Sequence, residues 1–395
     1  MTTRQFYFIF SIYIISLKIQ KMPCVLYEYM GKDSYVMFFI FMLVDFVGVI
    51  ISLMLSKQLR KFKINTLSNK KVIDIFVKIF LIFVSIYFLA QAILLYEAIQ
   101  DLFSHILFND LSWKIFGLFL LGAIFFMASF DYDNIGRIGE IFFPFILFSL
   151  IFLCLFGIIK SNFSAILPFQ TLKNYDYFDI FKKFSIWFGD FFLIIFVGTK
   201  SNNISLKHTI LTYGFSMLFV IIFIISFESK FLVNSSIQPS VISVISEQSL
   251  LSINIGRIDW LFILIAEVGT VISASLCLCI AKKTLFITFK KVKINYYLML
   301  FSAVIYLLDI NYLVDLTIKE QFFLNFSSYF AFYLKVIVIV ILFFKIINNI
   351  KSNSKNKNFY YLKNAKFKTD GYYKNLSKSK LKRTNVMKKE EIKYD

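Results

Sequence analysis

The sequence predicts an all-α polytopic membrane protein with about ten transmembrane helices. Of its 395 residues, 58% are hydrophobic and 19% are aromatic, and the mean hydropathy is +0.73. Apolar runs of about 20 residues recur along the chain, which is the length that a helix needs to cross a bilayer. A soluble domain does not need so much apolar surface, so the composition and the recurring apolar runs exclude a soluble protein.

Ten spans can be drawn from the apolar runs. Their expected boundaries are 5–22, 35–56, 72–96, 113–130, 140–159, 185–200, 209–228, 259–281, 295–313 and 326–346. No internal repeat is visible in the sequence. Ten spans nevertheless divide into two sets of five, and the inverted repeats of transporters often leave no visible trace in a sequence. We therefore expect one permease-like domain over 1–346 with a five-plus-five inverted-repeat fold.

The distribution of charge in the loops predicts the orientation. The loops 57–71 and 282–293 are rich in Lys and Arg, whereas the loop 97–112 contains three acids and no basic residue other than histidine. Because cytoplasmic loops have an excess of positive charge, both termini are expected in the cytoplasm. Four lysines in the loop 160–184 run against this assignment, but the other loops agree with it.

The region after the last span is a basic tail. Residues 347–395 contain fourteen Lys or Arg against four acids. Such a segment is expected to be disordered in water and attracted to anionic lipid at the inner membrane surface. Because the basic residues lie in loops and in this tail, the net charge of +19 indicates membrane topology rather than nucleic-acid binding.

Two acids stand inside apolar runs and are the first candidates for function. Asp190 lies within Phe184–Thr199, and Glu267 lies about two turns inside the eighth span. A charged group at membrane depth is costly unless it faces a cavity or a partner. Ser185, Trp187 and Gly189 surround Asp190 and are included in the predicted ligand site. The alternative is that Asp190 bonds to a neighbouring helix, or is hydrated near the membrane surface because Gly189 loosens this short span.

The first span should end or unwind near Ser16–Pro23. Lys18, Gln20 and Lys21 cannot face lipid at this density, and Pro23 disfavours helix at the residue before it. In inverted-repeat transporters the first helix of each half is broken at the midplane, and the free backbone groups bind the ligand. Those helices would be spans one and six, with Ser16 and Lys18 near the ligand. The alternative is that span one stops early and its lysines reach the outer headgroups.

Further charged and proline residues lie at span ends and are candidates for structural or gating roles. Arg137 and Glu140 stand three residues apart, close enough to pair on one helix face, and Glu97 is expected at the outer end of span three. The full set is Pro23, Glu97, Arg137, Glu140, Pro144, Arg257 and Asp259.

No motif in the sequence indicates catalysis. It contains no nucleophile elbow, phosphate loop or dinucleotide-binding glycine pattern. Its two histidines are scattered, and Cys277 and Cys279 would lie on different faces of a helix. We expect neither an enzyme nor a metal or cofactor.

Several of these landmarks occur in the order of a known family. Thr2–Gln5 is similar to a short polar lead-in, Met22–Val36 to a proline followed by a Gly-x-Asp turn, and Ser185–Asp190 to a Ser-x-x-x-x-Glu segment with Asp in place of Glu. The remaining matches are Arg137, Glu140 and Pro144 at the entry to span five, Leu167–Pro168, Pro239, and the pair Arg257 and Asp259. In these features the chain resembles the spore germination permease family, the B subunit of nutrient germinant receptors in endospore-forming bacteria.

The resemblance covers about residues 2–346 and implies several further properties. The family belongs to the amino acid–polyamine–organocation transporter group, which implies the ten-helix fold and a small, amino acid-like nutrient. It also implies two protein partners, a membrane A subunit and a lipoprotein C subunit, and a location in the inner membrane of the spore or the cell membrane. One departure is that Ser16 and Lys18 stand where the family has glycines.

Three functions remain open at this point. The first is a germinant receptor subunit that binds a nutrient between spans one, three, six and eight. The second is a secondary transporter of amino acids, with Asp190 or Glu267 carrying a coupling proton. The third is a membrane scaffold without a ligand, which the scarcity of glycine and the presence of Lys18 favour.

Overall fold

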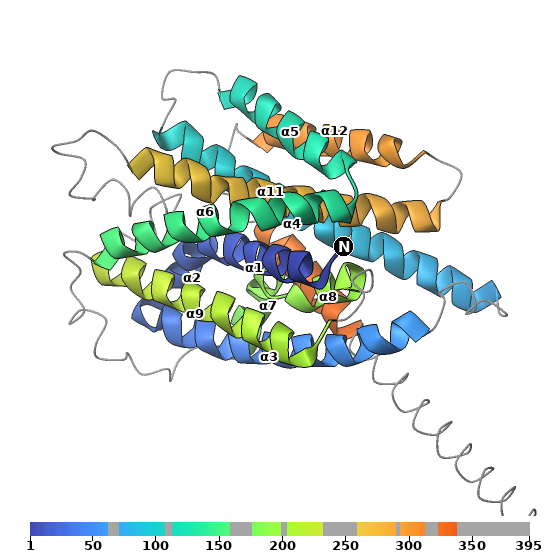
Figure 1. The fold of residues 1–395 in the computed structure, drawn as a ribbon, viewed down its shortest axis with the longest axis horizontal. Coiled ribbons are helices and arrows are strands. Elements are labelled where there is room, and N and C mark those ends of the chain that lie inside the picture. Colours follow the sequence, from blue (N-terminus) through green and yellow to red (C-terminus); the bar gives the residue numbers. More distant parts are fainter. Residues whose placement is uncertain are drawn as a thin grey trace, which may run out of the picture. The chain divides into compact units, whose positions relative to one another are not determined.

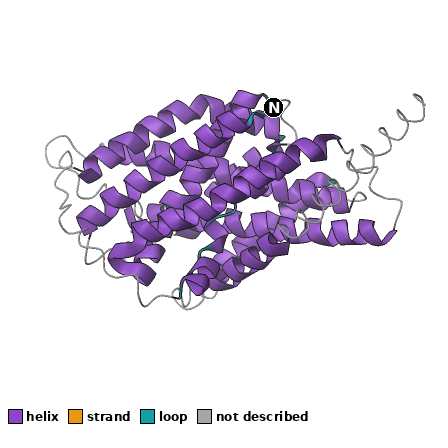
Figure 2. Ribbon diagram, turned by 90° about the horizontal axis from the view of Figure 1, so that it is seen from below, coloured by secondary structure: helices purple, strands orange, loops and turns teal. Residues whose placement is uncertain are grey.

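The computed structural model describes residues 1–61, 71–106, 113–158, 176–198, 204–231, 259–289, 293–312 and 323–337. The chain divides into a compact unit, Met1–Lys335, and a second unit, Val336–Asp395, of which only the first two residues are described. Within the described ranges every regular element is a helix, as Figure 2 shows. The all-α class is therefore confirmed, and the predicted basic tail lies outside the described residues.

Figure 1 shows the described helices coloured in the order of the sequence. Their bounds are α1 Thr3–Ile19, α2 Met22–Met30, the 3-10 turn η1 Gly31–Asp33, α3 Ser34–Lys61, α4 Lys71–Ile106, α5 Trp113–Ser129, α6 Tyr132–Ile158, α7 Tyr177–Lys183, the 3-10 turn η5 Ser185–Trp187, α8 Asp190–Phe196, α9 Leu206–Phe231, α11 Asp259–Thr288 and α12 Ile294–Tyr312. Residues 323–335 are also helical.

Among the described residues, five helices are long and apolar enough to cross a membrane. These stretches are Ser34–Leu53, Val77–Phe103, Tyr132–Leu155, Leu206–Ser229 and Leu261–Thr288, and the bent pair of α1 and α2 would make a sixth. Large apolar side chains such as Phe119, Phe126 and Leu211 are exposed on the outside of the helices. An apolar outer surface of this kind is compatible with a protein embedded in a membrane.

Helices overlie the predicted spans, but several ends differ. Helix α6 begins at Tyr132 rather than at residue 140, and α4 continues to Ile106 rather than ending at residue 96. Glu97 therefore lies inside α4 and not at its outer end. Two of the predicted spans are matched by shorter apolar helices, Phe116–Ser129 and Asn295–Leu307.

Helix α1 lies at the centre of the compact unit. It packs against α6, α9 and α11, while α11 also packs along α4 and α6, and Figure 1 shows α1 between α6 and α9. Every side chain from residue 9 to residue 24 is buried. A helix that is apolar on nearly all sides belongs in such a position, since it has no face suited to water.

Two of the predicted spans are broken. The axes of α1 and α2 differ by 45°, because the backbone leaves helical geometry at Gln20, where ψ is −95°. Pro23 then occupies the first turn of α2, a position that does not need its missing N–H. The predicted span six consists of η5, an extended step at Phe188 and Gly189, and α8.

Candidate functional site

A buried ion pair joins the two broken spans. Lys18, in the last turn of α1, lies with its Nζ 2.6 Å from Oδ2 of Asp190, the first residue of α8. Both side chains are 0% exposed, and the Lys18 ammonium also lies 5.3 Å from the centre of the Phe188 ring. Lys18 therefore does not reach outward to headgroups. Its charge and that of Asp190 compensate each other in the interior.

Gly189 is required next to this pair because other groups fill the space around it. A Cβ atom at this position would overlap the Tyr87 hydroxyl and lie 3.2 Å from Cε of Lys335. The absence of a side chain lets α4 and the helix 323–335 approach the broken backbone closely.

Lys335 satisfies the backbone oxygens that the break leaves free. Its Nζ donates hydrogen bonds to the carbonyl oxygens of Ser185 and Phe188, and lies 3.0 Å from Oγ of Ser185. A carbonyl group without a partner is costly at membrane depth. The ammonium therefore stabilises the non-helical step between η5 and α8.

A hydrogen-bond network centred on Gln91 connects α1, α4 and η5. The Tyr13 hydroxyl donates to Oε1 of Gln91 over 2.7 Å, and Nε2 of Gln91 lies 2.8 Å from the Tyr87 hydroxyl and 3.0 Å from the Ile186 carbonyl oxygen. The bond to Ile186 fixes the position of η5 relative to α4, and the bond from Tyr13 ties α1 to the same buried amide.

Glu267 forms a second polar contact, at the break in span one. Nε2 of Gln20 donates to Oε1 of Glu267 over 2.8 Å and to Oγ1 of Thr270 over 3.0 Å. Ser16 lies on the same side of α1, since a Cβ atom on Gly269 would be 3.3 Å from its Oγ. Thus α11 holds the end of α1 through polar side chains.

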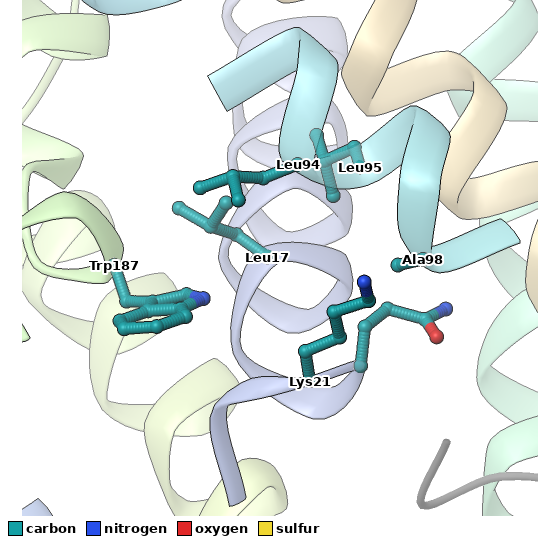
Figure 3. Close-up of a pocket in the computed structure, with 7 residues that line it drawn as sticks. Leu17, Lys21, Leu94, Leu95, Ala98 and Trp187 are labelled. Carbon is teal, nitrogen blue, oxygen red and sulfur yellow. The ribbon is translucent and has the colours of Figure 1, made fainter. Parts of the chain in front are cut away.

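A small pocket lies between the broken ends of the two spans (Figure 3). Figure 3 shows the Trp187 ring facing Leu17 and the Lys21 ammonium pointing toward α4. The lining residues are Leu17, Gln20 and Lys21 from α1 and the break, Leu94, Leu95 and Ala98 from α4, and Trp187 from η5. The cavity volume is about 10 Å³, which is room for about one water molecule.

Lys21 also forms an ion pair beside the pocket. Its Nζ lies 2.5 Å from Oδ2 of Asp101, and both side chains are partly accessible to solvent. Asp101 is the more accessible partner of this pair, and the Lys21 ammonium lies at the edge of the pocket. The arrangement can therefore offer an ammonium group to an anionic ligand that enters the pocket.

The remaining predicted residues lie away from this pocket or outside the described side chains. Glu140 pairs with Arg4, whose Nη2 is 2.5 Å away, and Arg137 is exposed on α6, so the expected pair within one helix face is replaced by a contact to the start of α1. Pro144 lies inside α6, on an exposed face. Arg257 is outside the described residues, and Asp259 is the first residue of α11.

Sequence reasoning missed three residues of this site. Asp45 on α3, Lys335 and Gln91 are all buried polar side chains in apolar helices. Asp45 and Lys335 carry the same signal that drew attention to Asp190, a single charged residue in an apolar run. Gln91 has no such signal, because an amide in an apolar helix is unremarkable until its partners are known.

No protein-family model matches the chain, and no curated protein matches it. In the part of the chain that the structure describes, no three His, Cys, Asp or Glu side chains are grouped as a metal site. The four cysteines, Cys24, Cys154, Cys277 and Cys279, are buried free thiols.

Proposed function

We propose that this chain is the membrane subunit of a spore nutrient germinant receptor and binds a small, amino acid-like nutrient between α1, α4, η5 and α11. The observation that supports this most strongly is the pocket between two broken helices that are linked by Lys18 and Asp190. The sequence motifs that resemble the germination permease family support the receptor role. The site binds rather than transforms its ligand, so the protein is not an enzyme.

The proposed fold is a ten-span, five-plus-five inverted repeat. Spans one and six would be the first helices of the two halves, and these are the spans that are broken. Breaks at corresponding positions of the two halves are typical of ligand sites in such transporters.

The chemistry of the pocket supports a ligand with one apolar and one anionic end. Leu17, Leu94 and Trp187 offer apolar contact, while Lys21 offers an ammonium group near a partly accessible acid, Asp101. Of the residues expected at the ligand, Trp187 lines the pocket and Glu267 stands behind Gln20. Ser16, Lys18, Ser185, Gly189 and Asp190 would hold the two breaks in place.

The pocket in this conformation is too small for an amino acid. With room for about one water molecule, it has to widen when a nutrient binds. We propose that the widening moves α1 relative to η5 and α8, and that this movement is the signal passed to the partner subunits. Those partners would be a membrane A subunit and a lipoprotein C subunit, in the inner membrane of the spore or the cell membrane.

A secondary amino acid transporter is the alternative function. It is favoured by the number of charged side chains buried near the breaks, which include Lys18, Asp45, Asp190 and Lys335. Buried ionisable groups of this kind are typical of ion or proton pathways in transporters.

The experiment that tests the proposal compares two phenylalanine variants in spores that lack the native gene. Ala98→Phe fills the pocket, whereas Ala303→Phe adds the same side chain on an exposed face of α12. We expect the germination response to a panel of amino acids to be lost in Ala98→Phe and retained in Ala303→Phe. Equal responses would contradict the proposed site. Uptake of the amino acid into proteoliposomes, with no effect on germination, would favour the transporter.

A further inference from the structure

Asp45 is a buried acid on α3, at the place where this helix approaches α8. The residue as a whole is 5% exposed. One turn further on, a Cβ atom at Gly48 would lie 3.2 Å from Cδ1 of Phe191, so the backbone of α3 comes close to α8. Asp190 directly precedes Phe191 on α8, so this approach places Asp45 and Asp190 on adjoining turns of the two helices.

Polar groups from two other elements act on Asp45. The Tyr213 hydroxyl on α9 donates to Oδ2 of Asp45 over 3.2 Å, and the Asp190 carboxyl group on α8 acts on Asp45 electrostatically. The other titratable groups that act on this pair of acids are Lys18 on α1, Lys335 on the helix 323–335 and Tyr87 on α4.

The hydrogen-bond donors of the two lysines are directed elsewhere. Lys18 donates to Oδ2 of Asp190. The three N–H groups of Lys335 face the carbonyl oxygens of Ser185 and Phe188 and the Ser185 hydroxyl. Among the described residues, neither ammonium group forms an ion pair with Asp45.

The second carboxylate oxygen of Asp190 needs a hydrogen-bond donor. Its Oδ1 is buried and accepts no hydrogen bond from the described residues. Two ionised carboxylates have only acceptor oxygens and repel each other, whereas a protonated carboxyl group can donate a hydrogen bond to an ionised one. One proton on Asp45 would remove the repulsion and give Asp190 Oδ1 its donor.

We propose that Asp45 is a proton-binding site, and that its carboxyl O–H donates to Oδ1 of Asp190 while Lys18 donates to Oδ2. In this arrangement Asp190 is the single anion between Lys18 and Asp45. Loss of the proton to water leaves two carboxylates facing each other, which favours the separation of α3 from α8. The site couples proton binding to the closed position of the broken span six, and it does not depend on the nature of the ligand.

The test measures the proton directly by infrared spectroscopy of the purified full-length protein in detergent. The C=O stretching band of protonated carboxylic acids is compared between the parent, Asp45→Asn and, as a control, Asp179→Asn, whose carboxylate pairs with Lys183 in a partly exposed position. We expect Asp45→Asn to lose part of this band and Asp179→Asn to keep it. Because buried Glu228 and Glu267 are present in every sample, the difference spectrum isolates Asp45. A band that is the same in parent and Asp45→Asn overturns the proposal.

The melting temperature at neutral pH is an independent test of whether Asp45 is protonated. An asparagine N–H can donate to Asp190 Oδ1 as a protonated carboxyl group does, so Asp45→Asn should melt with the parent, while Asp190→Asn should melt lower because it leaves Lys18 without its anion. If Asp45→Asn lowers the melting temperature as much as Asp190→Asn or fails to fold, Asp45 is an ionised partner of the lysines and the proposal is wrong.

Discussion

Lys18 and Asp190 are 172 positions apart in the sequence and form a 2.6 Å hydrogen-bonded pair in the fold. Each stands out in the sequence as an ionisable residue in an apolar run, which predicts that each needs a partner or a cavity. Only the structure shows that Lys18 and Asp190 are partners, because a single sequence gives no information on which distant helices pack together. The same holds for Asp45 and Lys335. Each is a single charged residue in an apolar run, and its role becomes visible only when its neighbours in the fold are known.

The first prediction concerns the charge of Lys18. Lys18→Gln leaves Asp190 buried without its counter-ion, so the free energy of unfolding should fall by about 3–5 kcal/mol. Chemical denaturation of the detergent-purified protein measures this change. The same substitution at Lys21, which pairs with partly accessible Asp101, should cost less than about 1 kcal/mol.

A double variant checks that the cost comes from the pair. Lys18→Gln combined with Asp190→Asn removes both charges, so its loss of stability should be smaller than the sum of the two single losses. Simple additivity would mean that the two side chains do not interact in the membrane-embedded protein.

The second prediction concerns the space at Gly189. A methyl group there overlaps the Tyr87 hydroxyl, so Gly189→Ala should destabilise the protein by about 1–3 kcal/mol or more. In the matched control, Gly122→Ala on α5, nothing lies within 4 Å of the new methyl group, and the higher helix propensity of alanine should stabilise by up to about 1 kcal/mol. Thermal unfolding compares the two. A similar effect of both substitutions would show that Tyr87 does not pack against the break.

At the scale of elements, the two breaks differ in how far the sequence predicts them. The break in span one follows from Lys18, Gln20, Lys21 and Pro23, and the 45° bend between α1 and α2 confirms it. For span six the sequence offered only Gly189 and the shortness of the apolar run. What makes the break stable is the ammonium of Lys335, which comes from a helix almost 150 residues away and could not be assigned from local sequence.

The third prediction follows from this contact. Lys335→Met keeps the length of the side chain but removes the donors to the Ser185 and Phe188 carbonyl oxygens, so the step between η5 and α8 should open more often. Hydrogen exchange followed by mass spectrometry should then be faster in peptides that contain residues 185–196. Lys283→Met, which removes an ion pair with Asp131, serves as the control and should leave these peptides unchanged. Unchanged exchange in Lys335→Met would contradict the role given to Lys335.

At the scale of the whole molecule, hydropathy predicted the helical class and the position of most helices. Their ends were less predictable. Helix α6 begins eight residues earlier than residue 140, because Glu140 finds its partner Arg4 near the start of α1 and the polar residues before it are tolerated in a helix. The pocket is lined by α1, α4 and η5, and a ligand site between spans one, three, six and eight stays a prediction.

The fourth prediction is topological. The Lys and Arg content of the loops predicts that both termini are cytoplasmic, so a membrane-impermeant thiol reagent added from outside should label Asn109→Cys and not Asn65→Cys. Both positions lie outside the described residues. The four native cysteines are buried, so they should contribute little background. The opposite labelling pattern would reverse the orientation.

The most direct test of the account is equilibrium binding of a radiolabelled amino acid to the purified protein, measured by scintillation proximity for the parent, Ala98→Phe and Ala303→Phe. The account predicts saturable binding to the parent and to Ala303→Phe, and loss of binding in Ala98→Phe, because only the latter fills the pocket between the broken spans. Because a phenylalanine side chain exceeds this small cavity, Ala98→Phe should melt lower than Ala303→Phe, and binding is compared at a temperature at which all three proteins are folded. Unchanged binding in Ala98→Phe would contradict the central claim that this pocket is the ligand site.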